Sequence, residues 1–378
     1  IEACLVGSEM CIRDRLIDMQ FNGIFIDKDY LENRSIEIGK KIESLESQII
    51  DLAGEEFNLN SSQQLAVILF DKLKLPMIKK RSTAEAVLSE LKDKHPLPEL
   101  ILSYRKLYKL KNTYLDPLPS YIVAETQRVH SSFNQTMTAT GRLSTSSPNF
   151  QNIPIRTEDG KEIRKAIKAQ SNEYQIFSAD YSQVELRVMA HLSGDVSLIS
   201  ALNNGEDIHT FTAKNIFNVD NDDMVLPEMR RIAKIVNFGI MYGAGPFRLS
   251  QELDIPFGEA KQIKDAYFEK YQGIEQYIEN SKLQIKETKS VETLLGRKRA
   301  VWDSDSQNKI RRDAAERMAI NMPIQGTAAE MIKLAMIKIH RQINKENLKS
   351  KLIMQIHDEL LLEVHQDEID YISKMVIQ

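Results

Sequence analysis

The sequence predicts an α+β fold in which two helical regions accompany a small antiparallel sheet. Apolar residues recur at helical spacing in the first third of the chain, and a mostly helical pattern fills residues 192–320. Four short apolar runs are typical of strands: residues 129–135, 174–180, 351–357 and 359–365. The last two are close enough in sequence to pair as a hairpin, with His357 and Asp358 near its turn.

The helices of the first third have recognisable ends. One apolar stripe with spacings of four, three, four and three residues stops at Gly54, a residue type that often terminates helices. The stripe comprises Ile38, Ile42, Leu45, Ile49 and Leu52. Capping residues at 60–63 predict a second helix over 65–73, and a basic helix with interleaved aromatic residues is expected over 104–114.

Length and charge set limits on the protein class. At 378 residues the chain exceeds one ordinary core, so two or three subdomains are expected. The 50 Lys and Arg against 54 Asp and Glu give a net charge of −4, which does not itself indicate a nucleic-acid binder. Basic residues nevertheless cluster locally, at 79–81, 105–111, 230–234, 297–299 and 311–312. No run of 18 apolar residues occurs, so no membrane partner is expected.

Two carboxylates stand at the ends of apolar runs, which is where a fold can aim them out of its core. Asp180 follows Ile176 and Phe177, and Asp358 follows the run that ends at Ile356. Hard oxygen ligands of this kind suit Mg²⁺, and two such carboxylates can share a pair of ions for in-line displacement at phosphorus. An isolated Asp at a strand end is also a common turn former or helix cap, so neither motif alone identifies a metal site.

A third segment has nucleotide-binding chemistry at helical spacing. Arg230, Lys234, Phe238 and Tyr242 recur every four residues and therefore share one broad helical face. Cations can meet phosphates there, and aromatic rings can meet a base. An ordinary amphipathic helix with solvated Arg and Lys would show the same pattern. Gly239 and Gly243 weaken a helix, so they indicate a close approach or a helix end.

Two further segments are consistent with contacts to a nucleic acid. Residues 138–154 form a polar, turn-rich loop that contains Arg142 and several amides, which can reach the sugar-phosphate backbone and minor-groove acceptors. Residues 311–330 predict a basic helix, a break at Pro323 and a second helix starting near Gly326 or Thr327.

Taken in this order, the segments resemble the family A DNA polymerases, the bacterial DNA polymerase I type. The resemblance runs from about Leu16 to Gln378 and covers the Klenow polymerase region without its exonuclease. It implies a right-hand architecture with a helical thumb, an antiparallel β-sheet palm and helical fingers. The implied parts are a thumb at 16–120, a palm at 121–190 with motif A (180–187), fingers at 191–320 with motif B (230–243), and further palm at 321–378 with motif C (357–359).

The resemblance implies a template-directed DNA polymerase that adds deoxynucleotides from dNTPs to a primer 3′-hydroxyl in replication and repair. Asp180 and Asp358, with the carbonyl of Tyr181, would bind two Mg²⁺ ions. Lys234 would protonate the leaving pyrophosphate, and Arg230 and His209 would hold its oxygens. By family position, Gln183, Glu185, Phe238 and Tyr242 would also contact the nucleotide.

Selectivity and DNA contacts follow from the same resemblance. Glu185 would exclude a ribose 2′-hydroxyl, and Phe238 in place of Tyr predicts discrimination against dideoxynucleotides. The residues implied to contact primer-template DNA or the incoming nucleotide are Arg142, Asn149, Gln151, Arg317, Asn321, Gln325 and His357. Glu359 would lie near the metals, and His130, His191 and His365 are expected to be structural or solvated rather than functional.

Both ends depart from the family pattern. Residues 1–15 hold both cysteines and read as a non-native leader, and the final palm strand of the family is missing after the helix that reaches Gln378. The absence of Cys from the rest of the chain is consistent with a reducing, cytoplasmic location. A monomer is expected.

Two other classes stay open. A catalytically inactive module could keep the fold and bind duplex DNA, although Asp180, Asp358, Lys234 and Arg230 are all present. A nuclease is the second alternative, because two-metal carboxylate sites also hydrolyse phosphodiesters.

Overall fold

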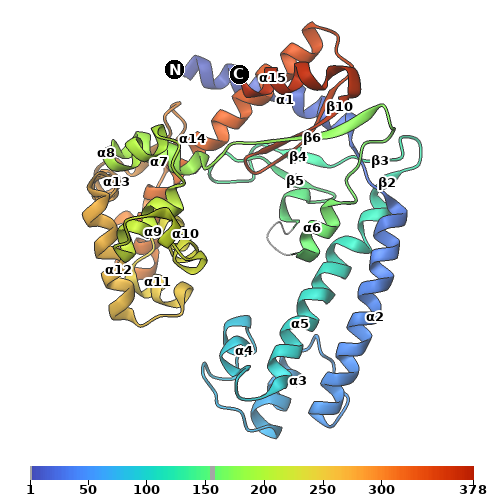
Figure 1. Ribbon diagram of the computed structural model, residues 1–378, viewed down its shortest axis with the longest axis vertical. Coiled ribbons are helices and arrows are strands. Elements are labelled where there is room, and N and C mark those ends of the chain that lie inside the picture. Colours follow the sequence, from blue (N-terminus) through green and yellow to red (C-terminus); the bar gives the residue numbers. More distant parts are fainter. Residues whose placement is uncertain (1, 154–157) are drawn as a thin grey trace. The chain divides into compact units, whose positions relative to one another are not determined.

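The computed structural model describes residues 2–153 and 158–378 (Figure 1). It confirms a mixed helix-and-sheet protein. The chain forms two compact units, the first from residues up to 19 with 133–144 and 177–378, and the second from 20–132 with 145–176. Within the described residues, no helix has both the length and the apolar character needed to cross a membrane.

The second unit is built on two long helices, α2 (Lys28–Ala53) and α5 (Pro96–Leu110), which lie side by side in Figure 1. The predicted helix ends are confirmed: Gly54 takes the left-handed conformation at φ 73° after α2, and Ser61 accepts a hydrogen bond from the Gln64 amide before α3. The other elements of this unit are β1 (Ile24–Phe25), α3 (Ser62–Ala66), η1 (Val67–Lys72), α4 (Glu85–Leu91), η2 (Lys111–Leu115), η3 (Leu118–Tyr121), β2 (Ile122–Val123), β3 (Arg128–Val129), η4 (Phe150–Asn152) and α6 (Glu158–Arg164).

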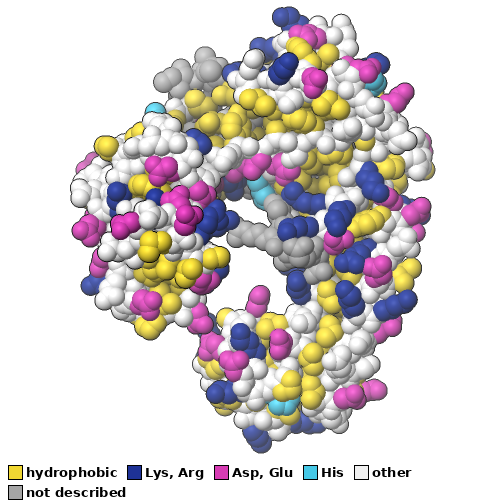
Figure 2. Space-filling model, in the orientation of Figure 1, with side chains coloured by type: hydrophobic (Ala, Val, Ile, Leu, Met, Phe, Trp, Pro, Cys, Tyr) yellow, Lys and Arg dark blue, Asp and Glu magenta, His cyan; other side chains and the backbone are white. Residues whose placement is uncertain are grey.

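The surface of the α2–α5 pair is charged. Figure 2 shows Lys and Arg side chains along these helices, interspersed with Asp and Glu. The helix expected over 104–114 is divided between α5 and the π-helical η2, and the helix expected over 65–73 is divided between α3 and the π-helical η1.

The strand expected over 129–135 is interrupted. β3 ends at Val129 and β4 covers Ser132–Asn134. The two residues between them have polar partners outside a strand ladder: the His130 Nδ1 atom lies 2.6 Å from the Gln20 carbonyl oxygen, and the Ser131 hydroxyl donates to the Pro148 carbonyl at 2.9 Å. These contacts replace the pairing that a continuous strand would need.

A three-stranded sheet in the order β6-β10-β9 positions the carboxylates of the first unit. β6 (Tyr174–Asp180) ends at the first predicted carboxylate. β9 (Lys351–Ile356) and β10 (Glu359–His365) pair antiparallel, with Ile356 opposite Glu359, so the turn falls on residues 357–358 as predicted. His357 has φ 53°, a left-handed conformation that closes this short turn.

Most of the first unit is helical. Its helices are α1 (Glu2–Asn22), α7 (Val184–Ser193), α8 (Val196–Asn203), α9 (Ile208–Phe217), α10 (Pro227–Met241), α11 (Pro246–Leu253), α12 (Phe257–Lys270), α13 (Gln272–Thr288), α14 (Lys309–Lys345) and α15 (Ile369–Ile377). The remaining elements of this unit are η5 (Asp222–Met224), β7 (Ser290–Glu292), β8 (Lys298–Ala300), η6 (Trp302–Asp305) and η7 (Gln366–Glu368). The first residue of β5 (Ser144–Ser146) belongs to the first unit and its other two residues to the second.

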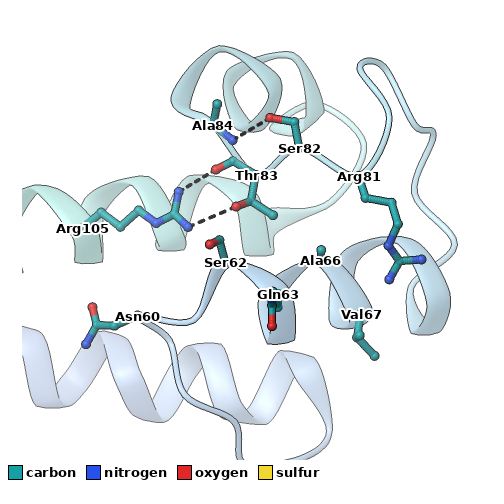
Figure 3. A pocket seen from close by; sticks show the side chains of 10 residues that line it. All are labelled: Asn60, Ser62, Gln63, Ala66, Val67, Arg81, Ser82, Thr83, Ala84 and Arg105. Carbon is teal, nitrogen blue, oxygen red and sulfur yellow. Dashed lines mark hydrogen bonds between the residues drawn. The ribbon is translucent and has the colours of Figure 1, made fainter.

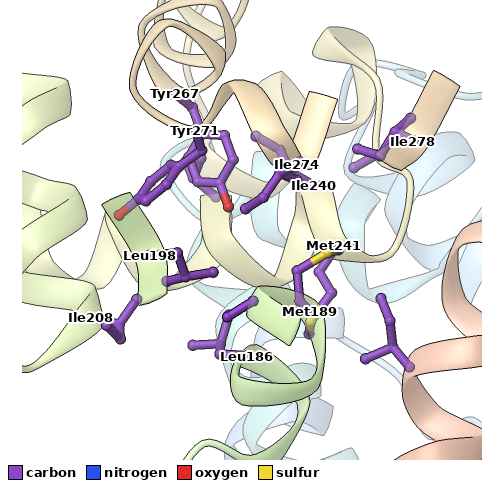
Figure 4. Close-up of a cluster of buried hydrophobic side chains, with 14 of the residues drawn as sticks. Leu186, Met189, Leu198, Ile208, Ile240, Met241, Tyr267, Tyr271, Ile274 and Ile278 are labelled. Atoms are coloured by element: carbon purple, nitrogen blue, oxygen red, sulfur yellow. The ribbon is translucent and has the colours of Figure 1, made fainter. Parts of the chain in front are cut away.

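One apolar cluster fixes the helix that carries the nucleotide-binding pattern. Ile240 and Met241 of α10 are 1% exposed and pack in the same cluster as Leu186 and Met189 of α7 (Figure 4). Tyr271 and other residues from α12 and α13 complete this core. Burying this face orients the opposite, polar face of α10 outward.

The predicted break at Pro323 is wrong, because α14 runs through it without interruption. Its residues are buried on both sides of the proline, Met322 in one apolar cluster and Ile332 in another. Ile324, also fully buried, belongs to the cluster around α10. Tertiary packing along the whole helix therefore outweighs the lost backbone hydrogen bond, which costs about 3 kcal/mol.

Both glycines of the α10 segment serve the two purposes that the sequence suggests. Gly243 follows the end of α10 at φ 72°, and a Cβ there would lie 3.0 Å from Cγ of Arg317. A Cβ on Gly239 would lie 2.9 Å from Leu249. A larger side chain at either position would push α14 or α11 away from α10.

Candidate active site

A polar pocket of about 400 Å³ in the first unit collects most of the predicted site residues. It lies between the end of β6, the start of α7, the outward face of α10, His209 of α9 and the β9–β10 turn. Its lining residues are Asp180, Tyr181, Ser182, Gln183, Val184, Glu185, Leu186, His209, Arg230, Lys234, Phe238 and Asp358. Residues that are far apart in sequence thus meet at one place.

Asp180 and Asp358 form what we call the acidic wall. The Tyr181 amide donates a hydrogen bond to the Asp358 carbonyl at 3.3 Å, which ties the end of β6 to the hairpin turn. Burial raises the pKa of Asp180, and the nearby charges of Asp358 and Glu359 raise it further. The wall therefore concentrates negative charge in a partly dry site.

This donor set fits a divalent cation. Two carboxylates that repel one another are stabilised when a hard cation lies between them, and the Tyr181 carbonyl supplies the same type of oxygen ligand. Arg142, which pairs with Glu185, lies 3.9 Å from Asp358. Within the described part of the chain, no group of three or more His, Cys, Asp or Glu side chains could hold a metal. A bound ion would thus need ligands from a substrate or water.

The opposite side of the pocket, the α10 wall, consists of Arg230, Lys234 and Phe238. Arg230 binds Asp207 through two hydrogen bonds of 2.8 and 3.1 Å. Although burial raises the pKa of Asp207, the bonds from Arg230 and Thr210 lower it to about 2. Lys234 has no ion pair or hydrogen bond to any described residue, so its ammonium is available to an anion.

His209 lies close to these cations and is neutral. Burial lowers its pKa to about 4; Asp207 opposes this shift, and Arg230 and Lys234 add to it. Its Nδ1 atom lies 3.1 Å from the Asn237 amide nitrogen. Its ring is 5.7 Å from that of Phe238. A neutral imidazole in this place can donate one hydrogen bond into the pocket without adding charge.

Glu185 is buried at the base of the pocket and held from two sides. The Tyr242 hydroxyl donates to Oε2 at 2.6 Å, and Arg142 Nη2 donates to Oε1 at 2.5 Å. Burial raises the pKa of Glu185, and these two partners oppose that shift. With both oxygens occupied, the side chain is a fixed obstacle at the base of the pocket.

The structure distributes the other predicted contacts around this pocket. Gln325 is half-buried on α14, and Arg317 packs against the Gly243 position. The Asn321 Oδ1 atom is buried without a hydrogen-bond partner among the described residues. His357 is exposed in the hairpin turn.

None of the predicted DNA contacts lines the pocket, and the two remaining ones lie in the other unit. Asn149 and Gln151 belong to the second unit, where the Asn149 side chain accepts from the Gln151 amide at 3.1 Å and caps η4.

In the first unit, Glu359 accepts a hydrogen bond from the Ser178 hydroxyl at 2.6 Å, which places it beside the acidic wall.

The sequence analysis did not identify the residues that support the pocket. Asp207, the partner of Arg230, also caps α9 through the Thr210 amide at 2.8 Å. Asn237 connects His209 to Thr212, whose hydroxyl lies 2.8 Å from that of Tyr271. Asp207 carried a visible capping signal, an Asp before a helical run. The buried Asn237 network had no signal in the sequence, because it depends on packing between three helices.

A larger hollow of about 840 Å³ lies in the second unit (Figure 3). Its two arginines already have partners: Arg105 donates to the Thr83 carbonyl at 2.6 Å, and Arg81 forms two hydrogen bonds of 2.6 Å with Asp71. No carboxylate lines this hollow. Its chemistry is therefore structural, and the pocket of the first unit is the better candidate for catalysis.

The family model described as DNA polymerase family A matches residues 28–378. The chain belongs to DNA polymerase family A.

Individual relatives agree over most of this chain. It is 47% identical over 366 residues to "DNA polymerase I, thermostable" of Thermus thermophilus, covering 95% of this chain and 43% of that protein. It is 45% identical over 377 residues to DNA polymerase I of Bacillus caldotenax, covering 98% and 43%. The chain thus spans less than half the length of these relatives.

A solved structure has the same fold. The POL domain of Pol1 from M. smegmatis, in complex with DNA primer-template and dNTP, matches with a TM-score of 0.93 and 39% identity. The match covers 97% of this chain and 65% of that one.

Proposed function

We propose that this chain is a DNA-directed DNA polymerase that adds deoxynucleotides from dNTPs to a primer 3′-hydroxyl. The observation that carries the proposal is the pocket that places Asp180 and Asp358 opposite Lys234 and Arg230. Carboxylates on one side and cations on the other suit a metal–triphosphate complex. Family membership and the M. smegmatis complex with primer-template and dNTP support the same reaction.

The acidic wall is the metal-binding part. Asp180 and Asp358, with the Tyr181 carbonyl, would hold two Mg²⁺ ions. Bound there, the metal would supply Lewis-acid activation of the primer 3′-hydroxyl and charge neutralisation of the triphosphate and the departing pyrophosphate. The backbone hydrogen bond between Tyr181 and Asp358 fixes the separation of the ligands, and Glu359 orients the wall through Ser178.

The α10 wall holds the triphosphate. Lys234, which has no partner among the described residues, contacts the phosphates and donates a proton to the leaving pyrophosphate. Arg230 exchanges its two hydrogen bonds with Asp207 for bonds to phosphate oxygens. His209 donates from its free nitrogen as a neutral group, since burial keeps its pKa at about 4.

The base of the pocket selects the sugar. Phe238 stacks near the sugar and base, and Gln183 contributes to the same surface. Glu185, held by Tyr242 and Arg142, occupies the space that a ribose 2′-hydroxyl needs. The Phe238 ring also favours discrimination against dideoxynucleotides, by analogy with the family.

Primer-template DNA is the macromolecular partner. Arg142, Arg317, Asn321, Gln325 and His357, with Asn149 and Gln151 of the second unit, contact it in this proposal. Minor-groove acceptors are shared by all correct pairs, so such contacts check pair shape without reading sequence. The chain acts as a cytoplasmic monomer in replication and repair, with residues 16–120 as thumb, 121–190 and 321–378 as palm, and 191–320 as fingers.

Primer extension tests the proposal. The protein is incubated with a labelled primer-template, Mg²⁺ and all four dNTPs, beside a reaction in which EDTA replaces Mg²⁺. Primer extension in the reaction with Mg²⁺, and not in the reaction with EDTA, supports the proposed polymerase activity. DNA binding without extension indicates an inactive DNA-binding module. A third reaction without dNTPs tests the nuclease alternative, because only a nuclease shortens the primer.

A further inference from the structure

One buried ion pair of the first unit has no part in the proposed reaction. Arg297, in the turn between β7 and β8, donates a hydrogen bond from Nε to Oε1 of Glu330 on α14 at 3.0 Å. The Glu330 side chain is 4% exposed, and that of Arg297 is 24% exposed. A carboxylate buried this deeply is costly without a cation beside it, so the two residues require each other. We call them the anchor pair.

The backbone of Arg297 is fixed on α14. The Arg297 amide donates to the Thr293 hydroxyl at 3.0 Å, and the Thr293 amide donates to the Arg297 carbonyl at 3.0 Å. In the same turn, the Leu294 amide donates to the Thr327 hydroxyl of α14 at 3.1 Å. Because this turn is closed on itself and bonded to the helix, α14 sets the place of the Arg297 guanidinium.

The guanidinium of Arg297 lies directly against the backbone of a second segment, the loop at residues 138–142. Gly141 of this loop is buried and has φ 78°. A Cβ at Gly141 would lie 2.8 Å from Nε and 3.1 Å from Cζ of Arg297. The absence of a side chain at Gly141 therefore allows the guanidinium to pack on the loop.

α14 touches the same loop at a second point. A Cβ on Gly326 of this helix would lie 3.2 Å from the Thr140 carbonyl oxygen. The loop itself is closed by the Thr138 hydroxyl, which donates to the Arg142 carbonyl at 2.6 Å. The anchor pair and the backbone of α14 thus hold a compact turn from two sides.

Arg142, which follows Gly141, is held at both of its neighbours. Gly141 rests on the anchor pair, and Leu143 is 5% exposed and packs in the apolar cluster that contains Ile332 of α14. Between these two points, Arg142 donates from Nη2 to Glu185 at 2.5 Å, and its Nε atom is buried without a hydrogen-bond partner among the described residues. The bond to Glu185 therefore depends on where the backbone places Arg142.

This dependence links the anchor pair to the base of the pocket. Glu185 is held by Arg142 and by Tyr242, and a shift of the loop would leave only the bond from Tyr242. A functional side chain keeps its place to within about 0.5 Å only when the residues behind it are themselves locked. The anchor pair provides that support for Arg142.

We propose that Arg297 and Glu330 are positioning residues for sugar selection, which hold Arg142 against Glu185 and so keep the Glu185 carboxylate in the space of a ribose 2′-hydroxyl. This inference rests on the proposed polymerase function and deepens it, because it adds two residues to the control of its nucleotide selectivity. Neither residue lines the pocket, so both act through Arg142.

The ratio of single-turnover rates for one rNTP and the matching dNTP tests the inference. Arg297→Lys keeps a cation for Glu330 but removes the planar group that lies on Gly141, and it should raise this ratio about threefold or more. Arg231→Lys is the matched control, because Arg231 forms an exposed ion pair with Glu228, and its ratio should equal that of the parent. A purely structural role would lower both rates together, so an unchanged ratio in Arg297→Lys would overturn the inference.

A second variant approaches the same contact from the loop. Gly141→Ala places a methyl group against Arg297 and should also raise the ratio. Gly54→Ala controls for backbone strain, because Gly54 has a similar φ of 73° and no atom within 4 Å of a Cβ. If Gly141→Ala and Gly54→Ala give the same ratio, the contact between Arg297 and the loop does not control selectivity.

A double variant tests the route through Glu185. In the Glu185→Ala background, Arg297→Lys should give no further rise, because the obstacle that Arg297 positions is already gone. A further rise of the same size would show that Arg297 acts elsewhere and would contradict the inference.

Extension by the parent with dNTPs is measured in the same series and distinguishes the two possible failures. If the parent extends the primer and the ratios do not change, the anchor pair loses its role while the polymerase function stands. If the parent binds the primer-template and does not extend it, the proposed function and the inference fall together.

Discussion

The two walls of the pocket are built in different ways. The acidic wall takes Asp180 and Asp358 from strand ends far apart in sequence and fixes them through a backbone hydrogen bond. The α10 wall takes Arg230, Lys234 and Phe238 from one helix at four-residue spacing. The acidic wall is fixed by its backbone and carries two carboxylates. The α10 wall consists of long side chains on one helix.

This difference indicates a division of labour. Metal ligands need fixed separation, which strand ends tied by the backbone supply. In the proposed function, triphosphate ligands must bind and release at every cycle, and Arg230 would exchange its hydrogen bonds with Asp207 for bonds to phosphate oxygens. Changes in the acidic wall should therefore abolish chemistry, whereas changes in the α10 wall should weaken it by degrees.

The largest expected effect is on the acidic wall. Asp358→Asn removes one metal ligand while keeping its shape, and it should lower the rate of primer extension by about 1,000-fold, since metal stabilisation is worth several kcal/mol. The measurement is single-turnover addition of one nucleotide. Asp370→Asn, an exposed change on α15, is the matched control and should be neutral. Comparable rates in the two variants would remove Asp358 from the metal site.

On helix α10, Lys234 belongs to the α10 wall and Arg231 does not, so the two form a natural pair for comparison. Lys234→Ala should lower the rate about 100-fold, because it removes a proton donor to the pyrophosphate. Arg231→Ala should change it less than about twofold, because the exposed Arg231 pairs with Glu228 at 2.5 Å and does not line the pocket. Equal losses would mean that α10 acts only through its total charge.

His209 sharpens the comparison through pH. Its pKa falls from 6.5 to about 4 on folding, so the unfolded chain binds the proton more readily between these values. Above about pH 6.5, His209 therefore does not reduce the free energy of unfolding. As the pH falls from there toward about 4, protonation of His209 in the unfolded chain lowers the free energy of unfolding. Between about pH 7 and about pH 5 the loss should be about 2 kcal/mol.

Urea unfolding at the two pH values measures this loss. The His209→Gln variant should lose less stability on acidification than the parent, whereas His191→Gln, an exposed control, should behave as the parent does. If the parent and His209→Gln have the same pH dependence, His209 is not held neutral by burial.

The smallest expected effect is on selectivity. Glu185→Ala should raise ribonucleotide incorporation relative to deoxynucleotides by on the order of tenfold or more, because the obstacle to a 2′-hydroxyl is gone. Tyr242→Phe removes one of the two hydrogen bonds that hold Glu185, and it should raise ribonucleotide incorporation by a smaller factor. The ratio of rates for rNTP and dNTP measures both, and an unchanged ratio in Glu185→Ala would refute the assignment.

The sequence predicted local features better than packed ones. The α10 face, the cap at Gly54 and the turn at residues 357–358 follow from spacing and turn chemistry, and the structure has each of them. The continuous helix through Pro323 and the interrupted strand after Val129 were missed. Both depend on contacts from distant segments, which override the local preference.

The site shows the same limit. Asp180, Lys234 and Asp358 were identifiable because each stood in a motif whose chemistry could be stated. Asp207 and Asn237 support the pocket through partners on other helices, and a sequence does not reveal such pairs until the helices are placed.

The central claim is that Asp180 and Asp358 act as one metal-binding unit. Single-turnover nucleotide addition by Asp180→Asn, Asp358→Asn and the double variant tests it most directly, with the Mg²⁺ concentration varied in each. The double variant should be little slower than either single variant, because residues that act as a unit give non-additive losses. Losses that multiply, or a single variant that retains the parental rate and Mg²⁺ dependence, would contradict the account.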